Sequence, residues 1–182
     1  MRQPAEPAID RHAVAITTHV TTRHKPTRPF NPARHKPMPD ATPPSTEFIY
    51  KAEVDIADRR SLGTSALGER LIVDILGGHF EGPRLRGRVL PGGADRQLLR
   101  PDGVKELHAL YEMQTDDGTV LTVDNRVVVD ESVQPERYAR SCVAIRAPAG
   151  PYEWLNRRVF VGTLASLGPS RKAVAIRVYM LT

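Results

Sequence analysis

Residues 104–129 read VKELHALYEMQTDDGTVLTVDNRVVV, and this stretch decides the fold class. Apolar side chains occupy every second position on both sides of the turn sequence at 116–118, most plainly from Leu121 to Val129. A period of two is typical of strands that turn one face to a core. Since so short a turn joins antiparallel neighbours, residues 104–129 are predicted to form a β-hairpin.

The same alternation recurs along the chain and predicts about nine strands. We expect them at 48–56, 71–80, 85–90, 97–100, 104–114, 119–129, 141–147, 155–163 and 173–181. Turn sequences rich in Gly, Pro and Asp separate these segments. Because no segment after residue 45 has a sustained helical period, the expected fold is all-β.

Nine short antiparallel strands suit either a sandwich or a closed barrel, since both bury one face of every strand. We favour a closed antiparallel β-barrel of about eight to nine strands over residues 46–182. Gly77, Gly78 and Gly87 are placed to form the bulges or bends that let long strands curl. A β-sandwich remains the alternative, because strand number alone does not determine closure.

Residues 1–45 differ in composition and are expected to be a disordered N-terminal tail. The first 44 residues hold nine of the 16 prolines and four of the six histidines. Proline removes amide donors and favours extended backbone, so no core can form there. Two Pro-x-x-Pro spacings leave a polyproline docking motif as an alternative, and a translation start at Met38 is another explanation of the segment.

Composition and charge exclude several classes of function. The 182 residues are 40% hydrophobic and 26% charged, without an apolar run long enough for a membrane span. Residues 1–44 carry seven Lys or Arg against three acids, and the remainder carries 19 against 18, so the predicted barrel lacks the basic stripe of a nucleic-acid-binding domain. One cysteine excludes an internal disulfide. We therefore expect a soluble cytoplasmic protein without nucleic-acid or membrane partners.

Four polar side chains fall on predicted apolar faces and mark a candidate site: Tyr50, His79, Tyr111 and Asn125. If these faces point inward, the four share one barrel interior and could orient a small oxygenated ligand. His79 is the predicted catalytic acid or base, because only its ordinary pKa lies near neutrality. The alternative for each is structural: a hydrogen-bonded histidine, packed tyrosines with hydroxyls at the rim, and an asparagine bonded to backbone.

Three further residues are candidate ligand contacts. Glu81 lies beside a predicted bulge that could turn it inward, although a solvated edge position is the alternative. Trp154 and Asn156 lie on a strand of mixed polarity that could line the lumen or contact a second subunit in a homo-oligomer, since Trp is enriched at interface hot spots. Asp95, in the turn sequence Gly92-Gly-Ala-Asp95, is expected to bond its own backbone.

Known cofactor and metal motifs do not occur in the sequence. It has neither a phosphate-binding Gly-x-x-x-x-Gly-Lys-Ser/Thr nor a dinucleotide-binding Gly-x-Gly-x-x-Gly. His79 and His108 are predicted on opposite faces, so they do not form a metal site. We expect no cofactor and no metal.

Several ordered blocks resemble the family known as domain of unknown function 3237, also called uncharacterised protein family 0311. They are Gly77-Gly-His-Phe-Glu-Gly-Pro-Arg-Leu-Arg-Gly-Arg-Val-Leu-Pro-Gly-Gly-Ala-Asp95, Arg100-Pro-Asp-Gly103, Leu107 to Tyr111, Tyr152-Glu-Trp-Leu-Asn156 and Phe160-Val-Gly162. The resemblance implies a closed antiparallel β-barrel, mostly bacterial, without a generally established activity. Arg96 departs from the tryptophan common in the family, and the stretch between Asn125 and Tyr152 is shorter than usual. Both departures are expected to affect the barrel mouth.

Two functions remain open from the sequence. The first is a barrel that binds a small organic molecule or acts on it without a cofactor, by proton transfer, isomerisation or elimination. The alternative is a non-enzymatic structural or interaction module whose barrel is filled and which self-assembles. A water-accessible cavity touching at least two of Tyr50, His79, Tyr111 and Asn125 supports the first, whereas a packed lumen supports the second.

Overall fold

Ten strands and one short helix form residues 42–182, the part of the chain that the computed structural model describes. The tail predicted at 1–45 lies outside the described residues apart from 42–45. In chain order the elements are β1 (Thr46–Ile56), β2 (Arg60–Ser65), β3 (Gly68–Glu81), β4 (Arg86–Val89), β5 (Ala94–Leu99), β6 (Lys105–Thr115), β7 (Val120–Asp130), β8 (Tyr138–Arg146), the 3₁₀ helix η2 (Glu153–Arg157), β9 (Phe160–Ser166) and β10 (Ala173–Leu181).

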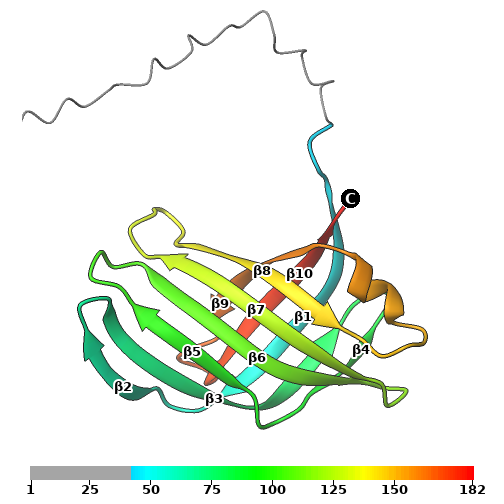
Figure 1. Ribbon diagram of the computed structural model, residues 1–182, viewed down its shortest axis with the longest axis horizontal. Coiled ribbons are helices and arrows are strands. Elements are labelled where there is room, and N and C mark those ends of the chain that lie inside the picture. The colour runs from blue at the N-terminus through cyan, green and yellow to red at the C-terminus, as the bar shows by residue number, and fades with distance from the viewer. Residues whose placement is uncertain (1–41) are drawn as a thin grey trace, which may run out of the picture. The chain divides into compact units, whose positions relative to one another are not determined.

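The strands close into a barrel. Antiparallel pairs connect them in the order β1-β10-β9-β8-β7-β6, and β3 completes the ring by pairing with β1. The short strands β4 and β5 share the position between β6 and β3, while β2 pairs only with the first part of β3. The fold is therefore a closed eight-strand antiparallel barrel with two extra strands, which confirms the predicted barrel (Figure 1).

A glycine pair bends β3 so that it exchanges partners halfway along its length. In the pairing with β1, Asp55 lies opposite Gly77, but the next residue, Ile56, lies opposite Ile75. Leu76 of β3 therefore has no opposite residue on β1 and is the extra residue of a bulge. Gly78 has φ +141°, and a Cβ at this position would lie 2.1 Å from the carbonyl oxygen of Glu53. Only glycine allows the two backbones to approach so closely. The bulge predicted at this position is therefore present.

Two segments differ from the predicted pattern. Strand β2 was not expected, because all six of its residues are exposed and alternation requires one buried face. The strand predicted at 155–163 is wrong in its first part, where η2 occupies Glu153–Arg157 and β9 begins only at Phe160. Leu155, which is 1% exposed, packs against the barrel core from this helix, so the apparent period of two did not reflect a strand.

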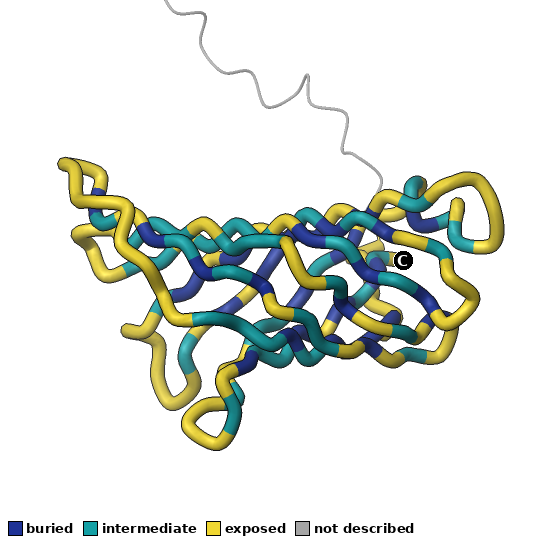
Figure 2. The backbone as a smooth tube through the Cα atoms, turned by 90° about the horizontal axis from the view of Figure 1, so that it is seen from below, coloured by how far each residue is buried: buried dark blue, intermediate teal, exposed yellow. Residues whose placement is uncertain are grey.

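The lumen is packed at one end and more accessible at the other. Near η2, orange in Figure 1, large side chains fill the barrel, and the rings of Tyr50 and Phe80 meet edge to face with centroids 5.8 Å apart. Buried and exposed positions alternate along the strands (Figure 2), as a barrel with one inward face per strand requires. None of the helical segments within residues 42–182 is long and apolar enough to cross a membrane.

Candidate functional site

A cavity of about 80 Å³ occupies the half of the lumen away from η2. Apolar side chains form most of its wall: Val54, Ile56, Val73, Ile75, Leu107, Ala109, Val127, Leu164, Val174 and Ile176. Of these, Ile56, Leu107 and Leu164 are partly exposed although they face inward, whereas Tyr50 and Phe80 in the packed half are at most 1% exposed. The lumen is therefore accessible from this end.

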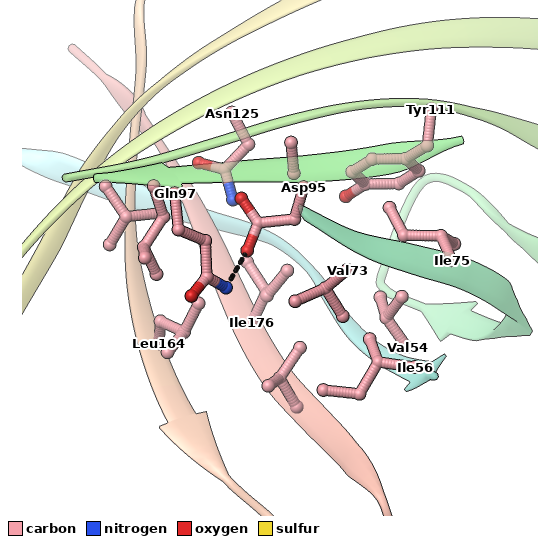
Figure 3. A pocket seen from close by; sticks show the side chains of 14 residues that line it. Val54, Ile56, Val73, Ile75, Asp95, Gln97, Tyr111, Asn125, Leu164 and Ile176 are labelled. Carbon is pink, nitrogen blue, oxygen red and sulfur yellow. Dashed lines mark hydrogen bonds between the residues drawn. The ribbon is translucent and has the colours of Figure 1, made fainter. Parts of the chain in front are cut away.

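Four polar side chains converge on the cavity: Asp95 and Gln97 from β5, Tyr111 from β6 and Asn125 from β7 (Figure 3). The sheet register explains how they meet. Asp95 pairs with Ala109, and Ala109 pairs with Asn125, so these three lie in one row across adjacent strands. Ala109, in the middle, has a side chain of only one methyl group. The row therefore leaves space between the carboxyl and the amide.

Most polar atoms of this group have no protein partner. Gln97 Nε2 donates a hydrogen bond of 2.6 Å to Asp95 Oδ2. Within the described part of the chain, no partner reaches the other carboxyl oxygen, Asp95 Oδ1, the Tyr111 hydroxyl, or either amide atom of Asn125. Tyr111 and Asn125 are each 1% exposed. Since an unpaired buried polar group costs about 1–3 kcal/mol, four such atoms around one cavity indicate a place for a polar partner.

Burial also changes the ionisation of these groups. Desolvation raises the pKa of Asp95, an effect that the hydrogen bond from Gln97 opposes in part. Burial likewise raises the pKa of Tyr111, so this phenol stays protonated and can donate a hydrogen bond at neutral pH. A carboxyl group whose pKa is raised exchanges protons more readily near neutrality than an ordinary aspartate.

The cavity chemistry disfavours anions. Among the described residues that line it there is no Lys, Arg or His, and Asp95 is the acidic member. An anionic ligand would therefore lose its hydration without gaining a countercharge. Residues 42–182 also contain no group of three or more His, Cys, Asp and Glu side chains that could hold a metal ion. Hydrogen bonds and apolar contacts are what this cavity can offer.

Two of the predicted site residues line the cavity, and one lies beside it. Tyr111 and Asn125 face the cavity, in the orientation that the alternation predicted. Tyr50 also faces inward and is 0% exposed, but it belongs to the packed half and does not line the cavity. Its hydroxyl has no partner among residues 42–182, and burial followed by the proximity of Tyr111 raises its pKa.

The expected inward orientation of His79 is wrong. Its side chain is 59% exposed on the outer surface, with Nε2 3.9 Å from Glu53 Oε2. The bulge at Gly77 reverses the alternation, so Ile75 and Phe80 face inward although they are five residues apart. Glu81 follows Phe80 and is exposed as well, so the structure contradicts its inward orientation and agrees with the alternative, a solvated edge position.

Trp154 and Asn156 lie outside the cavity and pack within the chain. Trp154 lies on η2, and the Arg84 guanidinium carbon stacks over the Trp154 ring, 3.8 Å from the ring centroid. The Trp154 ring also contacts Phe160. The Asn156 side chain accepts a hydrogen bond from the Ala147 backbone amide at 3.0 Å and donates one to its carbonyl at 2.8 Å. Both residues secure η2 to the packed end, so the strand predicted for them and its lumen-lining alternative are wrong, while a contact with a second subunit stays a prediction.

Sequence reasoning missed Asp95 and Gln97. Asp95 was expected to bond its own backbone in a turn, but β5 begins at Ala94 and carries its side chain into the lumen. A signal that could have found them is the spacing of Asp95, Gln97 and Leu99 at every second position, with Arg96 and Arg100 exposed between and after them. Arg96 lies between Asp95 and Gln97 on the outer surface of β5, and the expectation that it affects the barrel mouth stays a prediction.

Comparison with known proteins identifies the family. A family model described as "Protein of unknown function (DUF3237)" matches residues 44–181. A UPF0311 protein from Rhodopseudomonas palustris is 34% identical over 133 residues, which cover 66% of this chain and 87% of the relative. A related protein from Clostridium acetobutylicum is 32% identical over 108 residues, covering 52% of this chain and 68% of the relative.

Solved structures have the same architecture. The crystal structure of a conserved protein of unknown function from R. palustris aligns with a TM-score of 0.71 at 32% identity, covering 78% of this chain and all (100%) of that one. A β-barrel-like protein from Acinetobacter baumannii aligns with a TM-score of 0.70 at 31% identity, covering 79% and 99%. An enzyme from Penicillium herquei, at 23% identity and TM-score 0.65 over 80% and 99%, is similar in fold alone. The chain belongs to the DUF3237 family of proteins of unknown function, as the sequence blocks from Gly77 onward predicted.

Proposed function

We propose that the protein binds a small, neutral organic molecule in the open half of the barrel lumen. The observation that carries this proposal is the set of four unpartnered polar atoms, on Asp95, Tyr111 and Asn125, around one cavity with apolar walls. Convergent polar groups in an apolar pocket are characteristic of small-molecule sites, and a cavity of about 80 Å³, smaller than a drug-sized site, suits a ligand of only a few heavy atoms. Tyr111 and Asn125, two of the four polar residues predicted to share the barrel interior, line the cavity, which favours a binding barrel over a filled one.

The polar groups select the kind of ligand. Tyr111 can donate one hydrogen bond, Asn125 can donate and accept, and Asp95 Oδ1 can accept one or, when protonated, donate one. A ligand with an apolar body and one or two hydroxyl or carbonyl oxygens satisfies these groups and covers the aliphatic wall. In its catalytic form the proposal extends to proton transfer, isomerisation or elimination, which need a positioned acid or base and no cofactor.

Thermal unfolding of the full chain with phenol, cyclohexanone and benzoate tests this proposal. We expect the two neutral compounds to raise the melting temperature in a concentration-dependent way, since a ligand that binds only the native state stabilises it. Benzoate should have no such effect, because the cavity lacks a cation. Native mass spectrometry of the purified protein should in addition detect a retained organic molecule or a complex with phenol.

Two leucine substitutions, one inside the lumen and one outside it, test where the ligand binds. Ala109→Leu places a larger side chain between Asp95 and Asn125 and should abolish the effect of phenol. Ala144→Leu makes the same change on the exposed face of β8 and should leave it intact. If Ala109→Leu responds to phenol as the wild type does, or if no neutral compound stabilises the wild type, the lumen is not the binding site.

A further inference from the structure

Resting on the proposed binding of an organic molecule in the lumen, we infer that Asp95 moves protons as a general base and acid on a small neutral carbonyl compound. Tyr111 and Asn125 hold the carbonyl oxygen in this reaction. No charged group besides Asp95 lies among the described residues lining the cavity, so the carboxyl is the group there that can exchange a proton near neutral pH.

The carboxyl group is oriented by one oxygen and free at the other. Gln97 Nε2 holds Asp95 Oδ2 at 2.6 Å (Figure 3), while Oδ1 meets no donor within residues 42–182 and belongs to a residue that lines the cavity. Gln97 lies two residues along β5, on the same face of the sheet as Asp95. Gln97 is therefore a positioning residue, and Asp95 Oδ1 is the atom that can take a proton from a bound compound.

Two hydrogen-bond donors lie across from the carboxyl on neighbouring strands. Asn125 follows Ala109 in the same cross-strand row, and Tyr111 is two residues along β6 from Ala109. The Tyr111 hydroxyl and the Asn125 amide nitrogen are buried and unpartnered in the described chain. Because strands are about 4.8 Å apart, the row spans roughly 10 Å from β5 to β7, enough to hold a few ligand atoms above Ala109.

The arrangement supports a balanced proton transfer. Asp95 Oδ1 takes a proton from the carbon next to the carbonyl, the C–H electron pair becomes a carbon–carbon double bond, and the carbonyl π pair moves to oxygen. The resulting enolate oxygen accepts hydrogen bonds from Tyr111 and Asn125, which stabilise its negative charge. Protonated Asp95 then returns the proton to the same carbon or to a conjugated one, and the carbonyl re-forms. The net reaction is proton exchange or isomerisation, and no co-reactant is consumed.

The surroundings of Asp95 suit this role. Gln97 faces it from β5, Tyr111 from β6 and Asn125 from β7. The His108 side chain lies on the other face of β6 and bonds Asp124 at 3.0 Å, but the His108 backbone and its Coulomb interaction still lower the pKa of Asp95 and so oppose part of the effect of burial. Desolvation raises the pKa of the Asp95 carboxyl, which makes its ionised form a stronger base than an exposed aspartate.

Deuterium exchange of cyclohexanone in D₂O, followed by proton NMR with the full chain, tests the inference. Saturation-transfer NMR on the same samples reports binding separately from chemistry. We expect wild type to exchange the protons next to the carbonyl at least tenfold faster than buffer. Asp95→Asn should lose this acceleration while it still binds cyclohexanone, and the outer-face control Asp74→Asn should retain it.

Two further variants keep the inference testable if Asp95→Asn fails to fold. Tyr111→Phe removes only the hydroxyl and should slow exchange at least tenfold while saturation transfer persists. Gln97→Leu removes the donor that favours ionised Asp95, so the acid limb of the pH–rate profile should move to higher pH.

The outcomes separate the inference from the proposed binding. Binding of cyclohexanone without accelerated exchange, or exchange that Tyr111→Phe and Asp95→Asn leave unchanged, overturns the role of Asp95 and leaves the binding proposal standing. Absence of saturation transfer from cyclohexanone and from phenol overturns the binding site and the inference together.

Discussion

Asn125→Leu should make the unliganded protein more stable, although it alters a residue of the proposed site. Asn125 is 1% exposed, and neither its Nδ2 nor its Oδ1 has a partner in the described chain. Leucine has nearly the same shape and no polar atom, so the substitution removes a desolvation cost without opening a cavity. This is the opposite of the loss that most buried substitutions cause.

The size of the effect follows from the two unpaired atoms. Each costs about 1–3 kcal/mol when buried without a partner. Part of this gain is lost because leucine branches at a different angle from the amide, so we expect the free energy of unfolding to rise by about 2 kcal/mol. For a domain of this size the melting temperature should rise by roughly 5 °C.

A matched asparagine provides the control. The Asn156 side chain makes two hydrogen bonds to the Ala147 backbone, so Asn156→Leu leaves a backbone donor and acceptor unpaired and should lower the free energy of unfolding by about 1–3 kcal/mol. Urea unfolding of the wild type and of both variants measures the change in the free energy of unfolding. Equal slopes of this free energy against urea concentration show that the change lies in stability and not in the compactness of the unfolded state. If Asn125→Leu destabilises the protein as much as Asn156→Leu does, the Asn125 amide is already satisfied and the argument for a ligand-accepting site fails. The stabilised variant should also lose its response to phenol.

Three other perturbations have defined outcomes. Gly78→Ala forces a Cβ to within 2.1 Å of the Glu53 carbonyl and should destabilise by more than about 2 kcal/mol; an unchanged melting temperature would show that β1 and β3 can separate there. The pKa of Asp95 is higher in the native state than its ordinary value of 3.8, which applies in the unfolded state. Between these two pKa values the native state binds more protons than the unfolded state, so the contribution of Asp95 to the free energy of unfolding falls as the pH rises from 3.8 to the native pKa. Asp95→Asn should therefore stabilise the protein more at pH 7 than at pH 4, and thermal unfolding with equal effects at both pH values would contradict the raised pKa. Trp154→Ala loses the contact with Arg84 and the packing beneath it, and should lower the free energy of unfolding by about 2–4 kcal/mol in urea unfolding; a change below 0.5 kcal/mol, roughly the level of a neutral surface substitution, would mean that η2 does not secure the barrel end.

The proposed site illustrates an exchange of stability for function. The buried polar atoms of Tyr111 and Asn125 cost free energy in the unliganded protein, and an apolar side chain at either position would pack with less penalty. Strained or unsatisfied groups of this kind cluster at functional sites. The packed half of the same barrel is filled by aromatic and aliphatic side chains.

Local sequence was enough to predict an all-β fold and most of its strands, and the glycines at bulge positions favoured a closed barrel over a sandwich. Alternation from Leu121 to Val129 assigned the inward face of β7, and with it the burial of Asn125, because side chains on an uninterrupted strand alternate strictly. The same reasoning placed Tyr111 correctly on β6. These strands have no bulge in their mutual pairing, so their register extends unbroken along the hairpin.

Tertiary structure decided the rest, and the physical reason is the bulge in β3. One extra residue, Leu76 beside Gly77, reverses the side chains of β3 that follow it and so moves His79 to the outer surface. A glycine pair in a sequence shows that a bulge is possible but not which residue is the extra one. Asp95 reaches the cavity only because β5 pairs with β6 in a register that aligns it with Ala109 and Asn125. The alternation of side chains tells only which way each residue of one strand points. Which residues of β5, β6 and β7 meet depends on the register between strands, and long-range pairing and barrel closure determine that register.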